Sequence, residues 1–542
     1  MLSSLRSPSL RRSHRGAGRG EGRAFYRKTF TPPAYLFGYE KDNPSYEYLK
    51  TQILDQPSNQ YQGTETTYTA NLREARVFFE EKLADASHDQ VERWFKALTQ
   101  RFLFNVYELE KELDVFVVFE TMNNRGKQLS RLELLKNRLI YLSTLLLPPA
   151  TDGDRQTLRR NVNDAWKTVY EFLGREQDHP LPDDDFLRAH WIMYFTYSRE
   201  QAGQFAVFLL DEHFTTNAVS SAKLQPDDLQ RYVDSIQQSV KAWHAIQFPH
   251  RGEGLADEIK QDLEQLSRVG LGAFEPLIMA VLQQGAQLPE VRGFLQAAAR
   301  FVFVVARLSQ RRADTGDSAF YWLAGTVFRK ETTVAEATAF VDGKTAFFYS
   351  LEKAKAEMRD LFERSDGFYH WAGLRYLLFE YEQHLRAGAG MQAPKVSWEE
   401  FTAKQLRDHA TIEHIYPATP VRGEWPTFDV HSEAEQHALR HSLGNLLALS
   451  QSRNSKFSNR PFATKKQDGA DVRGYYNGSY SEIAVAQSPD WTPTTVLERG
   501  LEILKFLEDR WQVSLGERAS KVQLLGLDFL EPPAAAPAPG AA

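Results

Sequence analysis

Apolar residues recur at helical spacing through the middle of the chain. Two stretches show this most clearly, namely Leu158, Val162, Trp166, Val169 and Leu173, and then Leu229, Val233, Ile236, Val240 and Trp243. Positions three and four apart lie on one face of a helix, so each stretch predicts a helix with an apolar stripe facing the core. Pro226 precedes the second stripe, at a position suited to the first turn of a helix. We therefore expect a helical middle domain over residues 151–395.

A segment with a different pattern, DVFVVFETM, occupies residues 114–122. It is rich in β-branched and aromatic residues, which predicts a buried strand. Ser130 and Glu133, which follow, have the spacing of a capping box and place a helix start at Ser130. Asn123 and Gly126 would then lie in a turn beside the free N–H groups of that helix. Such a turn suits an anion, and phosphate in particular.

Residues 412–466 combine short apolar strands with acidic, imidazole and amide side chains. One strand carries Glu413 and His414 side by side and is closed by a proline. A second strand follows with Asn445 at its start, and a helical segment with Asn454 comes after it. The pattern predicts a strand–loop–strand–helix unit that gathers these four polar side chains.

These residue types suit the hydrolysis of a phosphodiester. That reaction needs a base to deprotonate water and a divalent cation to neutralise charge on the leaving oxygen. Successive residues of a strand point to opposite faces, so one member of the Glu413–His414 pair can bind a metal while the other faces the water. An oxygen-rich set of Glu and Asn ligands suits Mg²⁺ or Mn²⁺ better than Zn²⁺.

Composition narrows the function further. The 542 residues suffice for several domains, and 65 Lys and Arg against 71 Asp and Glu give a net charge of −6. This balance excludes a uniformly basic nucleic-acid coat, so any DNA contact must come from a local patch. Residues 451–466 form such a patch, with no acid and five basic residues, which are Arg453, Lys456, Arg460, Lys465 and Lys466.

The absence of cysteine excludes disulfides, cysteine zinc sites, iron–sulfur clusters and thiol nucleophiles. No apolar run has the length needed to span a bilayer. We therefore expect a cytoplasmic protein with no membrane partner.

Taken together, these motifs resemble a known family, the GmrSD-type modification-dependent restriction endonucleases. The residues that resemble its HNH (His–Me finger) nuclease domain are 413–417, 443–446 and 454–465, with Trp491, Arg499 and Trp511 further on. Upstream, residues 119–126 and 135–137 are similar to the last part of the family's ParB-like nucleotide-binding domain.

The resemblance implies a mainly α, multidomain fold of the α+β class. We expect five parts. The resemblance implies a truncated ParB-like α/β domain at 25–150 and an HNH domain of the ββα-metal type at 396–515, and helical periodicity predicts the middle domain at 151–395. Composition predicts a disordered Arg/Ser-rich segment at 1–24 and a Pro/Ala-rich tail at 516–542.

The resemblance also implies a role for each site residue. His414 is expected to be the general base, Glu413 and Asn454 the ligands of Mg²⁺ or Mn²⁺, Asn445 a supporting residue and Lys465 a phosphate contact. The implied activity is metal-dependent cleavage of double-stranded, modified DNA in a restriction system that acts against phage.

For the N-terminal domain the resemblance implies that Asn123 and Gly126 lie in an NTP pocket. The Asp-Gly-Gln-Gln-Arg block with which family members complete this pocket is not found in the sequence. A shortened gene, a misassigned start or a second subunit that supplies the motif would each explain this. We expect this chain to bind nucleotide weakly at best and to show no NTP hydrolysis.

Two other functions compete with DNA cleavage. One is a non-catalytic DNA-binding or regulatory remnant of such a system. The other is a zinc-dependent hydrolase that uses His437 and His441, which sit four residues apart on a predicted helix, although no third ligand stands nearby in the sequence.

Overall fold

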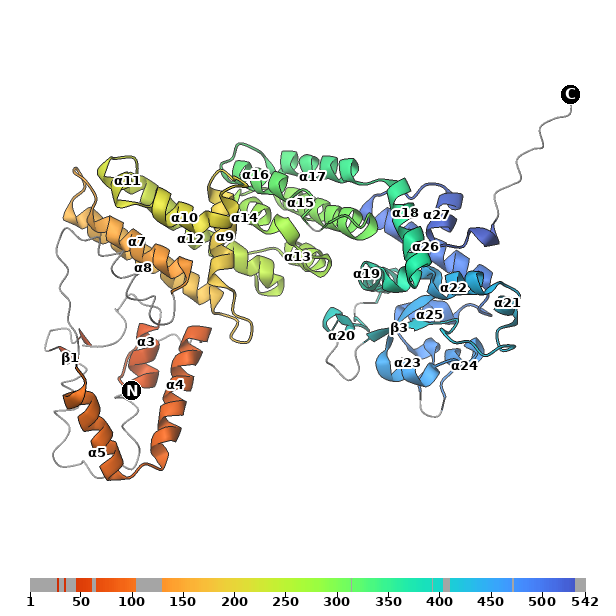
Figure 1. Cartoon of the computed structure of the whole chain (residues 1–542), viewed down its shortest axis with the longest axis horizontal. Helices are drawn as coiled ribbons and strands as arrows, with labels where there is room; N and C mark the ends of the chain where they lie inside the picture. The colour runs from red at the N-terminus through yellow and green to blue at the C-terminus, as the bar shows by residue number, and fades with distance from the viewer. Residues whose placement is uncertain are drawn as a thin grey trace. The chain divides into compact units, whose positions relative to one another are not determined.

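The computed structural model describes residues 27–28, 34–35, 45–60, 65–103, 129–312, 314–391, 393–402, 410–469 and 472–531, which are mostly helical (Figure 1). They form two compact units. Unit 1 takes the described residues up to 255 together with 275–285 and 318–331; unit 2 takes 256–274, 286–317 and the described residues from 332 onward. The helices of the expected middle domain are thus shared between both units, and the five-part division stays a prediction. No helix in the described part of the chain is both long enough and apolar enough to cross a membrane.

Unit 1 is helical apart from one short antiparallel ribbon. Its strands are β1 (Arg27–Lys28) and β2 (Ala34–Tyr35), and its helices are α3 (Tyr46–Tyr48), α4 (Thr67–Ala84), α5 (His88–Lys96), α7 (Arg131–Thr144), α8 (Asp152–Leu173), α9 (Asp183–Tyr194), α10 (Phe205–Val207), α11 (Thr216–Ser220), α12 (Pro226–Gln247), α14 (Glu275–Gln283) and α16 (Asp317–Phe328). Helices α8 and α12 lie side by side. Residues of both predicted apolar stripes are fully buried, among them Val162, Trp166 and Ile236.

The helix starts that the sequence predicts in unit 1 are confirmed. Ser130 caps α7: its hydroxyl accepts from the amide of Glu133 at 3.2 Å, and its own amide donates to the Glu133 carboxylate at 2.9 Å. Helix α12 begins at Pro226. The strand expected at 114–122 lies outside the described residues.

Unit 2 combines helices with a second antiparallel sheet. Its elements are α13 (Asp257–Val269), α15 (Leu288–Phe301), α17 (Val334–Phe348), α18 (Leu351–Arg364), α19 (Leu374–Gly388), α20 (Trp398–Thr402), β3 (Ala410–His414), α21 (Pro426–Asp429), α22 (Glu433–His441), β4 (Leu446–Ser450), α23 (Gln451–Phe457), α24 (Phe462–Lys466), α25 (Tyr480–Ala486), α26 (Pro493–Trp511) and α27 (Arg518–Leu524).

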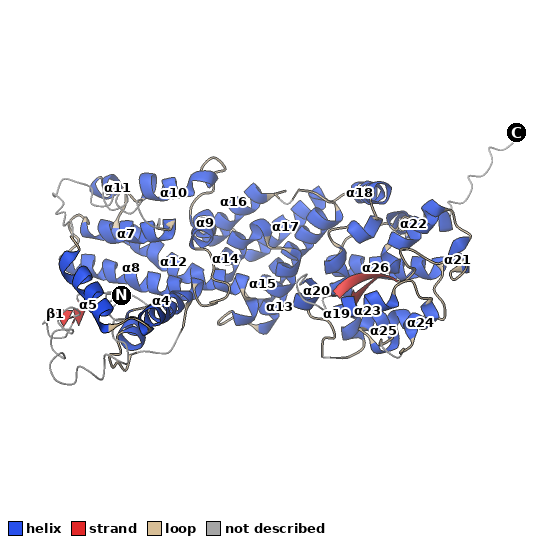
Figure 2. Ribbon diagram, turned by 60° about the horizontal axis from the view of Figure 1, so that its bottom comes forward, coloured by secondary structure: helices blue, strands red, loops and turns tan. Residues whose placement is uncertain are grey.

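The two strands of this sheet and helix α23 follow one another in the order that the sequence predicts. Strand β3 pairs with β4 in a register that sets Glu413 opposite Leu447 and His414 opposite Leu446. A 3-10 turn, Leu443–Asn445, leads directly into β4, and α23 begins at the residue after β4 ends. Helices α19 and α23 pack against the sheet (Figure 2).

Helix α26 lies directly on the 3-10 turn because Gly444 has no side chain. A Cβ at Gly444 would stand 1.8 Å from the carbonyl oxygen of Val496 and 2.8 Å from the amide nitrogen of Gly500. Both atoms belong to the backbone of α26, so no change of rotamer could make room. The turn that carries Asn445 is therefore pressed against a long helix.

Gly444→Ala is expected to destabilise unit 2 strongly. Overpacking typically costs about 1–3 kcal/mol, and we expect at least the upper figure because both clashing atoms are backbone. Gly343→Ala is the matched control, since Gly343 lies inside helix α17 and a methyl group added there would have no atom within 4 Å. The control should be neutral or stabilising by up to about 1 kcal/mol. Urea unfolding of both variants measures the difference. Equal unfolding midpoints would contradict the close packing of Gly444 against helix α26.

Candidate active site

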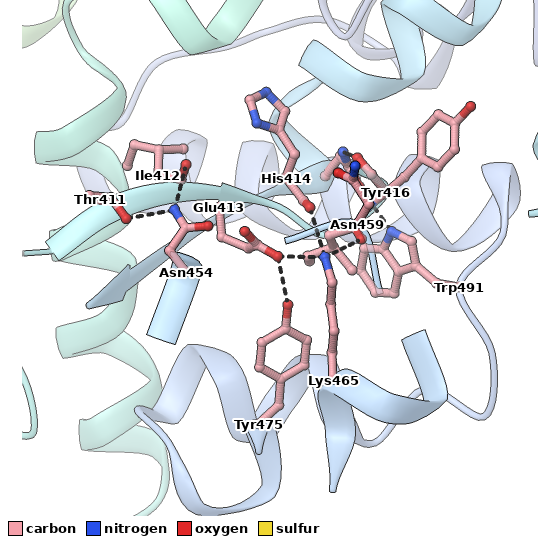
Figure 3. Close-up of polar contacts among 12 residues, drawn as sticks. Thr411, Ile412, Glu413, His414, Tyr416, Asn454, Asn459, Lys465, Tyr475 and Trp491 are labelled. Atoms are coloured by element: carbon pink, nitrogen blue, oxygen red, sulfur yellow. Dashed lines mark hydrogen bonds and ion pairs between the residues drawn. The ribbon is translucent and has the colours of Figure 1, made fainter. Parts of the chain in front are cut away.

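Strand β3 directs Glu413 and His414 to opposite sides of the sheet (Figure 3). Glu413 is 3% exposed and points into the core of unit 2, whereas His414 is half-buried. The alternation expected from the sequence is therefore present. Each of the two side chains has a separate set of partners.

The carboxylate of Glu413 is held by a buried ion pair. The Nζ of Lys465 lies 2.6 Å from Oε1, and the hydroxyl of Tyr475 donates to the same oxygen at 3.4 Å. Burial raises the pKa of Glu413, and the Lys465 ammonium opposes that rise. Both contacts end on Oε1, so within the described chain Oε2 is left for another ligand.

Lys465 is completely buried and uses its ammonium inside the protein. Besides Glu413, it donates to the backbone carbonyls of His414 at 3.3 Å and Ile415 at 3.2 Å. An ammonium has three donors, and all three have partners here. This placement differs from the phosphate contact expected for Lys465: the side chain ties helix α24 to the end of β3.

The imidazole of His414 lies between two aromatic rings. Its Nε2 is 3.1 Å from Nδ1 of His441, and its ring centroid is 4.6 Å from that of Tyr369. Burial, with His441 as a second cause, lowers the pKa of His414 to about 3. The ring is therefore neutral near pH 7, which is the form that can accept a proton. Its Nδ1 has no hydrogen-bond partner in the described part of the chain.

A cluster of His441, His437 and Asp366 lies next to His414, and only its two histidines are indicated by the sequence. Nε2 of His441 is 3.5 Å from Oδ1 of Asp366, and Nε2 of His437 is 3.3 Å from the same oxygen. Burial lowers the pKa of His441 to about 4. The spacing of the two histidines is visible in the sequence, but Asp366 comes from before α19 and no local pattern marks it.

Asn445 is fully buried and makes four side-chain hydrogen bonds. Its Oδ1 accepts from the amide of Tyr416 at 2.8 Å and from Nε1 of Trp491 at 3.0 Å. Its Nδ2 donates to the carbonyls of Tyr416 and Arg440, each at 2.9 Å. One amide therefore connects the end of β3 with the end of α22 and the start of α26.

Asn454 reaches back to β3 from helix α23. Its Nδ2 donates to Oγ1 of Thr411 at 2.6 Å and to the carbonyl of Ile412 at 3.4 Å. These bonds fix the amide so that its oxygen lies on the side facing Glu413 (Figure 3). A carboxylate oxygen and an amide oxygen are ligands that Mg²⁺ and Mn²⁺ prefer, so the residues present fit such an ion.

The basic patch at 451–466 exposes less charge than its composition suggests. Two of its five cations, Arg453 and Lys465, form ion pairs with the buried carboxylates of Glu482 and Glu413. A third, Lys466, donates to the carbonyl of Ser488. The exposed ones are Lys456 and Arg460.

The two residues expected in a nucleotide pocket, Asn123 and Gly126, lie outside the described residues. The nucleotide site therefore stays a prediction.

Two segments of the chain match models of known protein families. Residues 25–140 match the model of the N-terminal domain of the GmrSD restriction endonuclease, and residues 353–506 match that of the C-terminal domain of GmrSD restriction endonucleases. The second match contains every site residue described above, Asp366 included. No curated protein matches the chain.

Lys465→Met is expected to destabilise the protein by about 3–5 kcal/mol, because it leaves the Glu413 carboxylate buried without its counter-charge. The double variant Glu413→Gln/Lys465→Met should recover much of this loss, since neither remaining group is charged. Urea unfolding measures both.

Lys456→Met is the matched control, because this lysine is exposed on the neighbouring helix α23. It should change stability by no more than about 0.5 kcal/mol. A Lys465→Met protein as stable as the control would contradict the buried ion pair.

Proposed function

Because the chain belongs to the GmrSD restriction endonuclease family, we propose that it cleaves double-stranded, modified DNA with His414 as general base and Mg²⁺ or Mn²⁺ as cofactor. One observation carries this proposal: a neutral imidazole with an open Nδ1 stands next in sequence to a buried carboxylate, on one short strand. The order β3–β4–α23 supports an HNH unit of the ββα-metal type.

His414 is proposed to take a proton from the attacking water through Nδ1. For Nδ1 to be the acceptor, the ring proton must sit on Nε2, which then donates to Nδ1 of His441. Nε2 of His441 in turn carries a proton and faces Asp366 at 3.5 Å. This chain of contacts holds the imidazole in the tautomer that a base requires, as orienting partners do in other catalytic sites.

Glu413 and Asn454 are the residues proposed to hold the metal ion. Their hydrogen bonds use Oε1 of Glu413 and Nδ2 of Asn454. Oε2 of Glu413 and Oδ1 of Asn454 therefore stay available as metal ligands. When bound, the ion would offset the negative charge that develops on the phosphate and the leaving oxygen. Lys465 then serves as a positioning residue that aims Glu413, and the exposed Lys456 and Arg460 are the cations of this segment that can meet DNA phosphates.

His414→Ala is expected to reduce the rate of DNA cleavage by about 10²–10⁴-fold, the usual contribution of a general base. The assay follows nicking and linearisation of plasmids with and without modified bases, in Mg²⁺ or Mn²⁺. His384→Ala is the control, since His384 is exposed on helix α19 and takes no part in the site. Cleavage by His414→Ala at the wild-type rate would refute the assignment of the base.

Asn454→Ala should raise the metal concentration that gives half-maximal cleavage by at least about 10-fold, because it removes an oxygen donor. Asn459→Ala is the matched control: Asn459 follows the same helix, and among the described residues its side chain exchanges hydrogen bonds with Thr419 alone. A metal titration with one midpoint for both variants would remove Asn454 from the ligand set.

A further inference from the structure

A second group of potential metal ligands lies on the other side of His414 from Glu413. It consists of Asp366, His437 and His441, which each offer one ligand atom, all within 4.8 Å of one another. The two histidines stand one turn apart on helix α22, and Asp366 precedes the 3-10 turn Gly367–His370. Gly367 adopts φ +49°, a conformation that favours glycine, and this turn brings Asp366 to the helix.

One contact of this group is a long hydrogen bond and the other has no hydrogen-bond geometry, and both distances match those between the ligands of one metal ion. From Oδ1 of Asp366, Nε2 of His437 is 3.3 Å away and Nε2 of His441 is 3.5 Å away. Hydrogen bonds from an imidazole N–H to an oxygen are usually shorter, at about 2.7–3.2 Å. Zinc bonds to nitrogen and oxygen of about 2.0–2.1 Å give a tetrahedron whose edges are about 3.3–3.4 Å. The two observed separations are close to that edge.

We propose that Asp366, His437 and His441 bind one transition-metal dication of the zinc class, at a site separate from the oxygen donors Glu413 and Asn454. Two imidazole nitrogens and one carboxylate oxygen form a ligand set that suits Zn²⁺ and disfavours Mg²⁺. His441 is buried, whereas the side chains of His437 and Asp366 are 37% and 40% exposed, so an ion can enter from solvent. Arg440, the nearest cation on the same helix, has its guanidinium over the ring of Tyr416.

This site would control the base of the proposed nuclease reaction, a consequence that rests on the proposed function. An ion on Nε2 of His441 displaces the proton there, so the neutral ring carries its proton on Nδ1 and donates to Nε2 of His414. His414 must then hold its own proton on Nδ1. Each ring keeps one proton and no charge changes, but the nitrogen that should accept from water is blocked. Zinc therefore inhibits cleavage.

Zinc binding tests the site without any DNA. Calorimetry with the full chain and ZnCl₂, in excess Mg²⁺ at neutral pH, should find one ion per chain whose affinity falls at least about 100-fold in His437→Ala and in Asp366→Asn. His431→Ala is the matched control, because His431 lies next to α22 but outside the group. Asn454→Ala should bind zinc as the wild type does. Equal zinc affinity in wild type and His437→Ala would overturn the site.

The coupling to cleavage is tested separately. Added zinc should inhibit DNA cleavage by the wild type and by His431→Ala, and His437→Ala should resist it. If His437→Ala no longer binds zinc but is still inhibited by it, the proposed link between the site and cleavage is wrong, while the zinc site itself stands. Activation by zinc, abolished in His437→Ala, would overturn the inhibitory role in favour of a zinc hydrolase. If no variant cleaves DNA under any condition, the proposed function fails, while the calorimetry still decides the metal site.

Discussion

The side chain of Asn445 is the constraint on which the whole site depends. A primary amide has two N–H donors and one acceptor oxygen, and here every one of them is hydrogen-bonded. These bonds connect three elements: the end of β3, the end of α22 and the start of α26. His414 lies two residues before one of these attachment points, and His441 lies one residue after another. This single buried amide therefore holds close together the two segments whose imidazoles are in contact at 3.1 Å.

The burial of charge next to that amide has an energetic cost that the fold meets with pairing. Glu413 and Lys465 are both nearly inaccessible, and each would be unfavourable alone in the core. Apolar residues in both positions would give a comparable or greater stability, so stability alone does not explain the pair. In the proposed metal site the pair has a second role, because Lys465 holds Oε1 of Glu413 and leaves Oε2 available to the ion.

Sequence patterns predicted the parts of this structure that neighbouring residues determine. The cap at Ser130, the helix start at Pro226 and the succession of β3, β4 and α23 are all encoded within a few turns of chain. Lys465 was misleading for a physical reason: a run of basic residues without acids is typical of a surface, and its buried partner stands 52 residues away. Asp366 could not be found either, because it lies 71 residues from His437 in a polar segment.

The pairing of β3 with β4 has a consequence for how this domain can change over time. Since the side chains of a strand alternate, a slip of the pairing by one residue would exchange Glu413 and His414 between the two faces. The acid would then meet His441, and the imidazole would meet Lys465 and Tyr475. Neither new contact reproduces the pairs that the site uses. A strand that is longer or shorter by one residue would therefore lose the site. Insertions and deletions are therefore excluded from residues 410–414 far more strictly than substitutions. Diversity among related chains should instead accumulate in the accessible stretch 418–424 of the loop that follows β3.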